Sequence, residues 1–283
     1  MKEDRHISIA NNILTAHSRI AHEYAGGVNN GIAYYADSKN ASLRWEGRLF
    51  DKILSSIFSE IQMPKTAVFL DAGCGNGQWI EFFAMKYGFS NFIATDFSAS
   101  MLEYTKKRLS KLPVEVKYIR SNLESLDSIE SDSVDIVHLF GVIEHLDNPE
   151  IVIREFRRIL KNDGYLIINI PIKYSLCYFS YILFGISPEH WGLQPTWKRR
   201  LDFKSKIAHY RFYSKHNMRK MLSSHFKILQ QHNTAFSYAI SYLGLLHRKL
   251  PILSFALQDL YDFICRIISL NHPAGVYWLA RKE

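Results

Sequence analysis

Between residues 66 and 171, short apolar runs alternate with longer segments in which apolar side chains recur every three or four positions. The short runs have the length of buried strands, and the longer segments have the period of amphipathic helices. This alternation predicts βαβ units and an α/β fold built on a parallel sheet. The expected strands cover 67–71, 91–96, 114–121, 133–141 and 165–171, and the expected helices cover 78–88, 98–112 and 148–164.

Local signals mark the ends of these helices. Ser98 precedes one helix and is a residue type that caps helix N-termini. Asn148 and Pro149 open another, as N-cap and first helical residue, and Gly164 lies past its expected end. Gly88 follows the helix that begins after the first strand. The spacing of these signals agrees with the apolar pattern.

The regular alternation stops on both sides of this region. Residues 1–65 are interpreted as an N-terminal helical arm, in which 42–58 has helical spacing. Residues 66–283 are interpreted as one domain that carries cap insertions at about 172–213 and 235–272. Loops of that length usually carry function or are disordered. The remaining expected elements are a helix at 214–225 and strands at 226–233 and 275–282.

Composition adds few constraints. The chain has 283 residues, 47% of them hydrophobic, as in a globular protein, and a formal net charge of +8. A basic soluble enzyme is the plain interpretation, and attraction to an anionic membrane, nucleic acid or phosphorylated substrate is the sharper one. Cys74, Cys177 and Cys265 are far apart, which argues against a zinc site or a disulfide framework. No apolar leader precedes the first elements, so a cytoplasmic location is expected.

Two apolar segments stand out in the insertions. Residues 174–186 are too short to cross a bilayer, and 235–257 are interrupted by His247, Arg248 and Lys249. We therefore expect no transmembrane helix. Aromatic and apolar residues flanked by basic ones favour a lipophilic substrate and peripheral contact with a membrane. A helical cap or a homodimer interface is an equally good interpretation of both segments.

The segment FLDAGCGNGQW, residues 69–79, is the strongest chemical signal. Alternating glycines after a strand let the backbone approach a ligand at the carboxyl edge of the sheet. The P-loop pattern is absent, and in a dinucleotide fingerprint begun at Gly73 the third glycine would fall on Gln78. Asp71 would repel a pyrophosphate but attract the sulfonium and amino groups of S-adenosylmethionine (SAM). The loop therefore favours SAM over NAD.

Residues after the next two strands complete a nucleotide site. Asp96 lies about twenty residues past the loop, where a carboxylate can accept the ribose hydroxyls. Phe97 and Met101 can flank an adenine. Asn122 and Glu124 can bond its amino edge, although Asn122 is equally well explained as a turn residue.

These segments resemble the successive motifs of class I SAM-dependent methyltransferases, and are most similar to the ubiquinone-type and other small-molecule O-methyltransferases. The resemblance covers about 66–171 and rests on VFLDAGCGNGQW, ATDFSASML, SNLESL and the run from Val134 to Pro171. It implies a Rossmann-like sheet of seven strands, helices on both faces, an antiparallel last pair, and SAM as cofactor. Many relatives have Asp where this chain has Asn122.

The resemblance also implies roles for single residues. The glycine loop would line the methionine moiety, Asp96 would hold the ribose, and Asn122, Leu123 and Phe140 would border the adenine. The expected cofactor-binding residues are Asp71, Ala72, Gly73, Cys74, Gly75, Asn76, Gly77, Asp96, Phe97, Met101, Asn122, Leu123 and Phe140.

Methyl transfer needs an aligned acceptor and often a base. Glu144 and His145, after the fourth strand, are the candidate catalytic residues, and a purely structural role for both is the alternative. His138 lies within a strand and is expected to be a core histidine. Further candidates in the first insertion are His190, His209, Arg211 and Tyr213. No cluster has the spacing of metal ligands, so we expect no metal.

Two other functions stay open. A nucleic-acid methyltransferase is disfavoured because residues 139–145 lack the Asn/Asp-Pro-Pro-aromatic motif, and the similar NIPI at 169–172 follows the wrong strand. The basic run at 198–206 is more typical of a solvated face than of a nucleic-acid site. A noncatalytic SAM-binding protein is the second alternative. The favoured acceptor is a small, lipophilic or quinone-like molecule, methylated on oxygen.

Overall fold

The computed structural model describes residues 41–146, 148–175, 213–236, 250–268 and 272–283. Within these residues a seven-stranded sheet has the order β3-β2-β1-β4-β5-β7-β6. β1 to β5 pair in parallel, whereas β7 is antiparallel to both β5 and β6. The expected α/β fold is therefore confirmed, including its antiparallel edge. The strands are β1 (Val68–Ala72), β2 (Asn91–Asp96), β3 (Glu115–Arg120), β4 (Val134–Phe140), β5 (Leu160–Pro171), β6 (Lys227–Asn233) and β7 (Gly275–Arg281).

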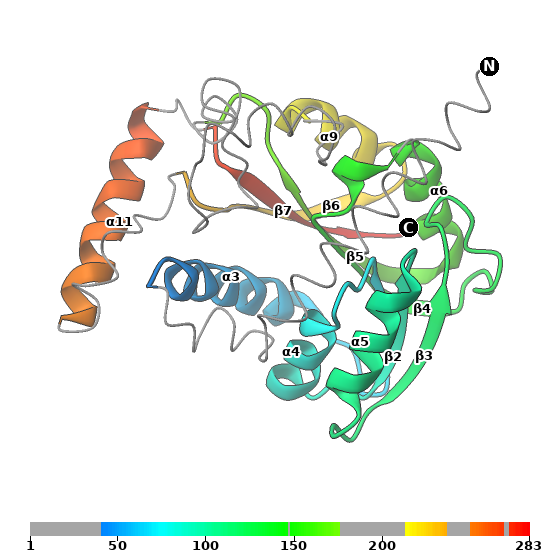
Figure 1. Cartoon of the computed structure of the whole chain (residues 1–283). Coiled ribbons are helices and arrows are strands. Elements are labelled where there is room, and N and C mark those ends of the chain that lie inside the picture. Colours follow the sequence, from blue (N-terminus) through cyan, green and yellow to red (C-terminus); the bar gives the residue numbers. More distant parts are fainter. Residues whose placement is uncertain (1–40, 147, 176–212, 237–249, 269–271) are drawn as a thin grey trace, which may run out of the picture.

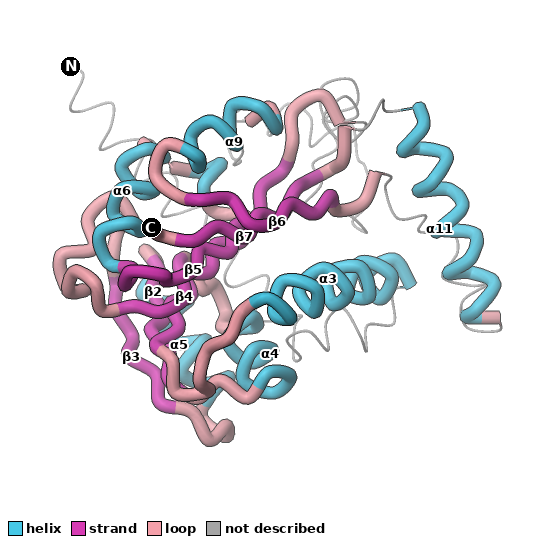
Figure 2. Tube along the Cα trace, turned by 180° about the vertical axis from the view of Figure 1, so that it is seen from behind, coloured by secondary structure: helices cyan, strands magenta, loops and turns pink. Residues whose placement is uncertain are grey.

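Helices cover both faces of the sheet (Figures 1 and 2). Successive strand residues point to opposite faces, so each strand contributes to two cores. Leu70 and Val137 belong to the core under α6 and α9, whereas Phe69 and Ile136 belong to the core under α3, α4 and α5. The helices are α3 (Ala41–Glu60), α4 (Gln78–Tyr87), α5 (Ala99–Leu109), η1 (Ile143–His145, a 3-10 turn), α6 (Pro149–Ile159), α9 (Lys215–Ser223) and α11 (Pro251–Ile268).

The helix α3 is part of the domain core. Leu54 and Ile57 are fully buried, and the Phe58 ring stacks on Tyr87 of α4 with centroids 4.3 Å apart. The described part of the expected arm, residues 41–65, therefore packs against the sheet. The division at residue 65 stays a prediction, and residues 1–40 lie outside the described residues.

The expected helix 148–164 is wrong at its C-terminal end. α6 ends at Ile159, and Leu160 already pairs with Val134 at the start of β5. The following turn, with Asp163 at φ 63°, is held by the C-terminus of the chain, since Asp163 N donates to Lys282 O at 3.0 Å. A tertiary pairing more than a hundred residues away thus replaces the last helical turn.

The predicted caps have different outcomes. Ser98 Oγ accepts from Met101 N at 3.4 Å and caps α5 as expected. Asn148 stands at the N-cap of α6, but its side chain makes no capping bond. Its Nδ2 donates to Glu124 Oε2 at 3.1 Å instead, and so ties α6 to the segment after β3.

Candidate functional site

The three glycines after β1 all have left-handed backbone, but they have different surroundings. Gly73, Gly75 and Gly77 have φ of 71°, 54° and 78°. A Cβ on Gly73 would lie 2.6 Å from Val142, and one on Gly77 would lie 2.8 Å from Thr105. A Cβ on Gly75 would meet no protein atom within 4 Å. Two of these glycines are therefore required by packing, and only Gly75 faces open space.

The loop is fastened to the end of β2. Gly75 N donates to Asp96 Oδ2 at 2.9 Å, and Ser98 N donates to Asp96 Oδ1 at 2.8 Å. Cys74 N donates to Thr95 O at 2.8 Å. Thr105 Oγ1 of α5 donates to Gly75 O at 2.8 Å. The carboxylate of Asp96 is thus held in one orientation beside the glycine that faces open space.

A second set of bonds fixes the far side of the loop. Arg108 of α5 donates from Nε to Asn76 O at 2.8 Å and from Nη1 to Glu81 Oε2 at 2.9 Å. Asn76 Oδ1 accepts from Gln78 N at 3.3 Å. The side chain of Asn76 therefore supports the start of α4.

The carboxylate of Asp71 is buried and paired with a histidine. Asp71 is 1% exposed, and its Oδ1 lies 2.8 Å from Nδ1 of the fully buried His138. The β1–β4 register places the two residues directly side by side. The rings of Trp79 and Phe83 surround the imidazole, with centroids 5.4 and 4.9 Å away. His138 is the core histidine that was expected, and it holds Asp71 inside the sheet.

The loop nevertheless lies in a negative environment. Cys74 is buried, and its thiol pKa is raised well above the usual value. Burial is the largest cause, followed by the charges of Asp71 and Asp96. Cys74 is therefore a neutral thiol at physiological pH, and it senses an anionic field that a cationic ligand would relieve.

The comparisons with known proteins fit this geometry. Residues 70–168 match the family described as a methyltransferase domain. Residues 70–168 form a methyltransferase domain. The match includes the end of β1, the glycine loop, Asp96 and the strands β2 to β4. The family inferred from the sequence is thereby confirmed for these residues.

Individual relatives are similar over part of their length. The mitochondrial ubiquinone biosynthesis O-methyltransferase of Candida albicans is 31% identical over 127 residues, which are 44% of this chain and 39% of that protein. A malonyl-acyl-carrier-protein O-methyltransferase of Halalkalibacterium halodurans is 30% identical over 146 residues, 47% and 53% of the two chains. The chain thus spans about half or less of these curated relatives.

A solved structure supports the fold. A SAM-dependent methyltransferase of Thermotoga maritima superposes with a TM-score of 0.56 at 17% identity, covering 96% of this chain and 100% of that one. At this identity the likeness concerns the fold alone.

The segments after β2 and β3 carry several of the expected cofactor-binding residues. Phe97, 45% exposed, and the half-buried Met101 follow Asp96, and Phe97 O accepts from Arg120 Nε at 3.1 Å. Asn122 Oδ1 accepts from Glu124 N at 3.1 Å, which is the turn role left open above. Glu124 itself binds Asn148, so its carboxylate is committed to α6.

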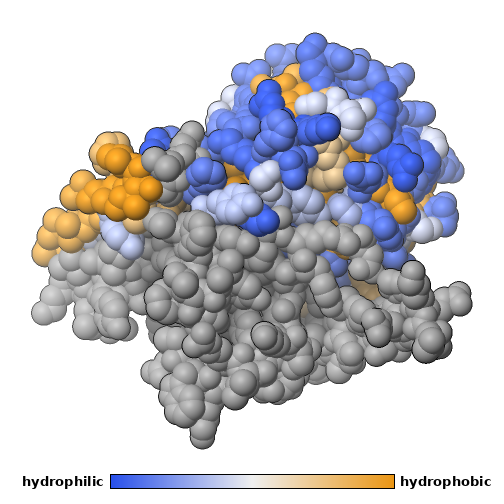
Figure 3. Space-filling view, turned by 90° about the horizontal axis from the view of Figure 1, so that it is seen from above, coloured by the Kyte–Doolittle hydropathy of each residue, from blue (hydrophilic) through white to orange (hydrophobic). Residues whose placement is uncertain are grey.

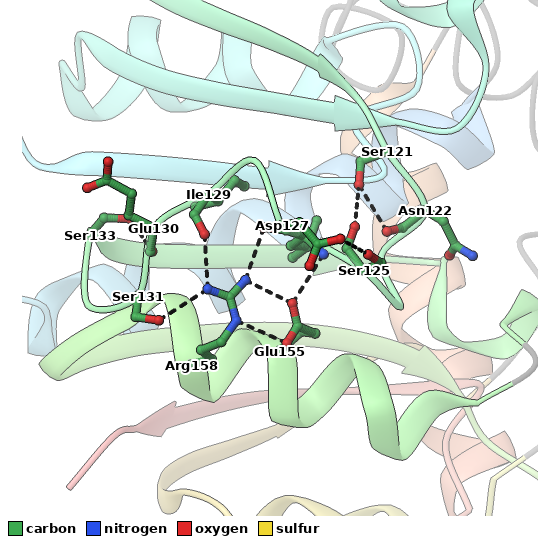
Figure 4. A network of polar contacts seen from close by, with 11 residues as sticks. Ser121, Asn122, Ser125, Asp127, Ile129, Glu130, Ser131, Ser133, Glu155 and Arg158 are labelled. Carbon is green, nitrogen blue, oxygen red and sulfur yellow. Dashed lines mark hydrogen bonds and ion pairs between the residues drawn. The ribbon is translucent and has the colours of Figure 1, made fainter.

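The segment after β3 is fastened from below by Arg158 of α6 (Figure 4). Its guanidinium donates to Ile129 O at 3.0 Å, to Leu126 O at 3.0 Å and to both oxygens of Glu155. The amide nitrogen of Asn122 points away from this network (Figure 4). That donor is therefore presented on the outer side of a fixed turn.

Two of the expected adenine neighbours lie in different cores. Leu123 is buried in the core under α6, whereas Phe140 packs in the core under α3 and α4. The Phe140 ring lies 4.7 Å from Trp79 and 5.5 Å from Phe50, between centroids. The structure does not bring the Phe140 and Leu123 side chains together. The sequence did not predict that Phe50 and Trp79 pack beside Phe140, because aromatic residues at helical spacing indicate only a core.

The candidate catalytic residues lie in the turn after β4. Glu144 is 2% exposed. Its carboxylate lies next to Gly141, since a Cβ built on that glycine would be 3.6 Å from Glu144 Oε1, so the side chain folds back over its own turn. His145 is half-buried, and its backbone N donates to Val142 O at 2.9 Å. Of the two, His145 is the more accessible to a substrate.

Several expectations fall outside what is described. His190, His209, Arg211 and the basic run 198–206 lie outside the described residues. Tyr213 is described, and its carbonyl accepts from Lys173 N at 2.9 Å. In the described parts of the chain, no three His, Cys, Asp or Glu side chains form a group that would hold a metal ion. In the same parts, no helix is long and apolar enough to cross a membrane.

Proposed function

We propose that the protein is a SAM-dependent methyltransferase that acts on a small lipophilic acceptor, with oxygen as the favoured methylated atom. The observation that carries the proposal is the open space over Gly75, next to a carboxylate of Asp96 fixed by two backbone N–H groups. A ligand there would meet the backbone of Gly75 on one side and, on the other, the Asp96 carboxylate, which can accept hydrogen bonds from hydroxyl groups. In an adenosine ligand, the ribose hydroxyls would donate to this carboxylate, and the 5′ substituent would run along the glycine loop.

Charge supports SAM over a dinucleotide. Asp71 and Asp96 both act on the Cys74 thiol, so the loop lies within reach of two negative charges. A pyrophosphate would be repelled by them, whereas the sulfonium and ammonium groups of SAM would be attracted. His138 keeps Asp71 directed into the sheet at 2.8 Å, so Asp71 acts through its field and not by direct contact.

The remaining cofactor roles follow the positions of the residues. Asp96 would accept the ribose hydroxyls, and Phe97 with Met101 would flank the adenine. Asn122 has its oxygen committed to the turn, so its amide would donate to the adenine ring. Leu123 would close the site from the α6 core, whereas Phe140 would support the floor through Trp79.

The reaction is a displacement in which SAM supplies the electrophilic methyl group. His145 is proposed as the base that takes the proton from the acceptor hydroxyl, because imidazole titrates near neutral pH. Glu144 is buried beneath the same turn and is proposed as its positioning residue.

The acceptor class is proposed from the relatives and from the surface. One relative is named as a ubiquinone biosynthesis O-methyltransferase. The helix α11 presents apolar side chains to solvent, which suits work on a lipophilic molecule at a membrane surface. A homodimer is the alternative use of that surface.

Ligand-dependent unfolding tests the cofactor part. A ligand at about 100 times its dissociation constant adds roughly 2.7 kcal/mol to the folded state. We expect a rise in Tm of several degrees with SAM or S-adenosylhomocysteine and none with NAD. A rise with NAD alone, or none with the adenosyl ligands, would contradict the proposal.

A pair of matched variants locates the binding. Gly75→Ala and Gly88→Ala both place a side chain on left-handed backbone, at φ 54° and 75°, without a close clash. Gly88 lies at the opposite end of α4, a helix of 10 residues that is about 15 Å long. We expect similar losses of Tm without ligand, and loss of the ligand-induced rise in Gly75→Ala only.

Turnover separates the enzyme from a noncatalytic binder. S-adenosylhomocysteine release is measured with lipid extract, polar metabolites and RNA as acceptor pools. We expect release with the lipid pool. Release with RNA alone would favour the nucleic-acid alternative, and intact binding without release in any pool would favour the noncatalytic one.

A further inference from the structure

The helix α11 turns its apolar side outward and its polar side toward the protein, the reverse of an ordinary surface helix. Ten of its described side chains are apolar and exposed, and at about 100° per residue they fill one continuous half of the helix circumference. Ile252 is 84% exposed, Phe263 57% and Ile267 62%. The exposed apolar residues are Ile252, Leu253, Ala256, Leu257, Leu260, Tyr261, Phe263, Ile264, Ile267 and Ile268.

The opposite half of α11 holds the helix on the protein by polar contacts. Asp259 Oδ1 accepts from Trp45 Nε1 of α3 at 2.6 Å. Asp262 Oδ1 accepts from the backbone N of the fully buried Phe236, also at 2.6 Å. Ser254 and Gln258 are 2% and 3% exposed. The contacts therefore fix which side of the helix faces outward.

The exposed half is visible at the edge of the molecule. In Figure 1, α11 stands apart from the sheet, beside the N-terminal end of α3, and Figure 2 shows the same separation from behind. From above, an orange group lies at that edge, while the surface over the sheet is mainly blue (Figure 3).

We propose that this apolar half of α11 docks the protein on a lipid bilayer, with the helix lying in the plane of the interface. No charged side chain falls on that half among the described residues of the helix. Tyr261 lies at its border, and an aromatic ring of this kind suits the interface between acyl chains and head groups. The helix is not long and apolar enough to cross a membrane. Lying in the interface, its 18 residues would extend over about 27 Å. The chain's net charge of +8 adds attraction to anionic lipid.

A second copy of the chain fits this surface less well. Two packed helices share a narrow apolar stripe, whereas a helix that lies half-immersed in lipid meets it over half its circumference. A stable protein interface uses about 20–30 residues on each side. The apolar half of α11 offers ten among the described residues. The inference rests on α11 alone and does not depend on the proposed reaction.

Vesicle co-sedimentation of the full chain tests the inference. Vesicles of phosphatidylcholine alone and of phosphatidylcholine with one-fifth phosphatidylglycerol separate apolar insertion from charge attraction. The double variant F263E/I267E puts two charges on the apolar half. The matched control Met85→Glu changes a side chain that is 72% exposed on α4.

We expect wild type and Met85→Glu to bind both vesicle types, more tightly with the anionic lipid. The double variant should lose at least about tenfold in partitioning, because each glutamate would be moved out of water. Its ligand-induced Tm shift should stay unchanged, which separates this test from that of the proposed function. Equal binding by all three proteins, or no binding by wild type, would overturn the proposal. So would a wild-type dimer by light scattering without vesicles that becomes a monomer in the double variant.

Discussion

The helices α6 and α11 use opposite sides to attach to the same domain. In α6, Val152, Ile153 and Phe156 are fully buried, and its arginines lie on the outer side. In α11, the buried positions include Ser254 and Gln258, and the outer side is apolar. Both helices are amphipathic, so amphipathicity alone does not tell which side a helix buries.

The difference lies in what surrounds each helix. α6 covers a sheet whose strands are apolar on that face, and the hydrophobic effect drives its apolar side inward. α11 meets polar partners at the edge of the fold, namely the indole N–H of Trp45 and the backbone N–H of Phe236. Each of these donors needs an acceptor once it is buried. The polar side of α11 therefore faces inward, and the apolar side is left for an outside environment.

Removing one aromatic ring from each helix should give the largest contrast. Phe156→Ala empties a fully buried position and should cost about 3–5 kcal/mol of unfolding free energy. Phe263→Ala, at a side chain 57% exposed, should change it by less than about 0.5 kcal/mol. Urea unfolding without lipid measures both. A loss above about 2 kcal/mol for Phe263→Ala would mean that the apolar half of α11 is packed in the free protein.

The polar side of α11 gives a test of intermediate size. Asp262→Ala leaves the buried N–H of Phe236 without this acceptor, which should cost about 1–3 kcal/mol. The loss should appear as faster hydrogen exchange at the Phe236 amide. Leu257→Ala, on the exposed half of the same helix, is the control and should leave that exchange unchanged. Equal effects of the two variants would contradict the reversed attachment of α11.

Much of the fold was predictable because its signals are local. Five strands, the glycine loop and the cap by Ser98 follow from periodicity and turn residues within short windows. The antiparallel pairing of β7 with its neighbours was implied by the family resemblance and is present. The early end of α6 was not predictable, since Lys282 at the far end of the chain draws Asp163 out of the helix.

The site was predictable in outline only. The proximity of Asp96 to the loop follows from the parallel order of β1 and β2. The pairing of Asp71 with His138 depends on the β1–β4 register, which joins residues 67 positions apart. Phe140 and Leu123 come from different segments, the end of β4 and the turn after β3, and they belong to different cores. A signal for α11 was present, because Ser254, Gln258 and Asp262 are polar at four-residue spacing within an apolar run.

The outer side of α6 gives the smallest expected effect, and it depends on pH. The hydrogen bond from Arg158 is the largest cause that lowers the pKa of Glu155. A carboxyl with a lowered folded-state pKa stabilises the protein above its unfolded pKa, about 4.3, and loses that stabilisation as pH falls through the folded value. Because the pair is partly exposed, Glu155→Gln should cost only about 0.5–1 kcal/mol at pH 7.

The variant should therefore converge with wild type as the pH is lowered below about 4. Glu130→Gln is the matched control, because the Glu130 carboxylate points away from the Arg158 network (Figure 4). Its unfolding free energy should follow wild type across the whole pH range. A constant difference between Glu155→Gln and wild type down to pH 2 would show that the amide disturbs packing and not an ion pair. The polar side of α6 would then resemble that of α11, because hydrogen bonds and packing would set its contribution to the unfolding free energy.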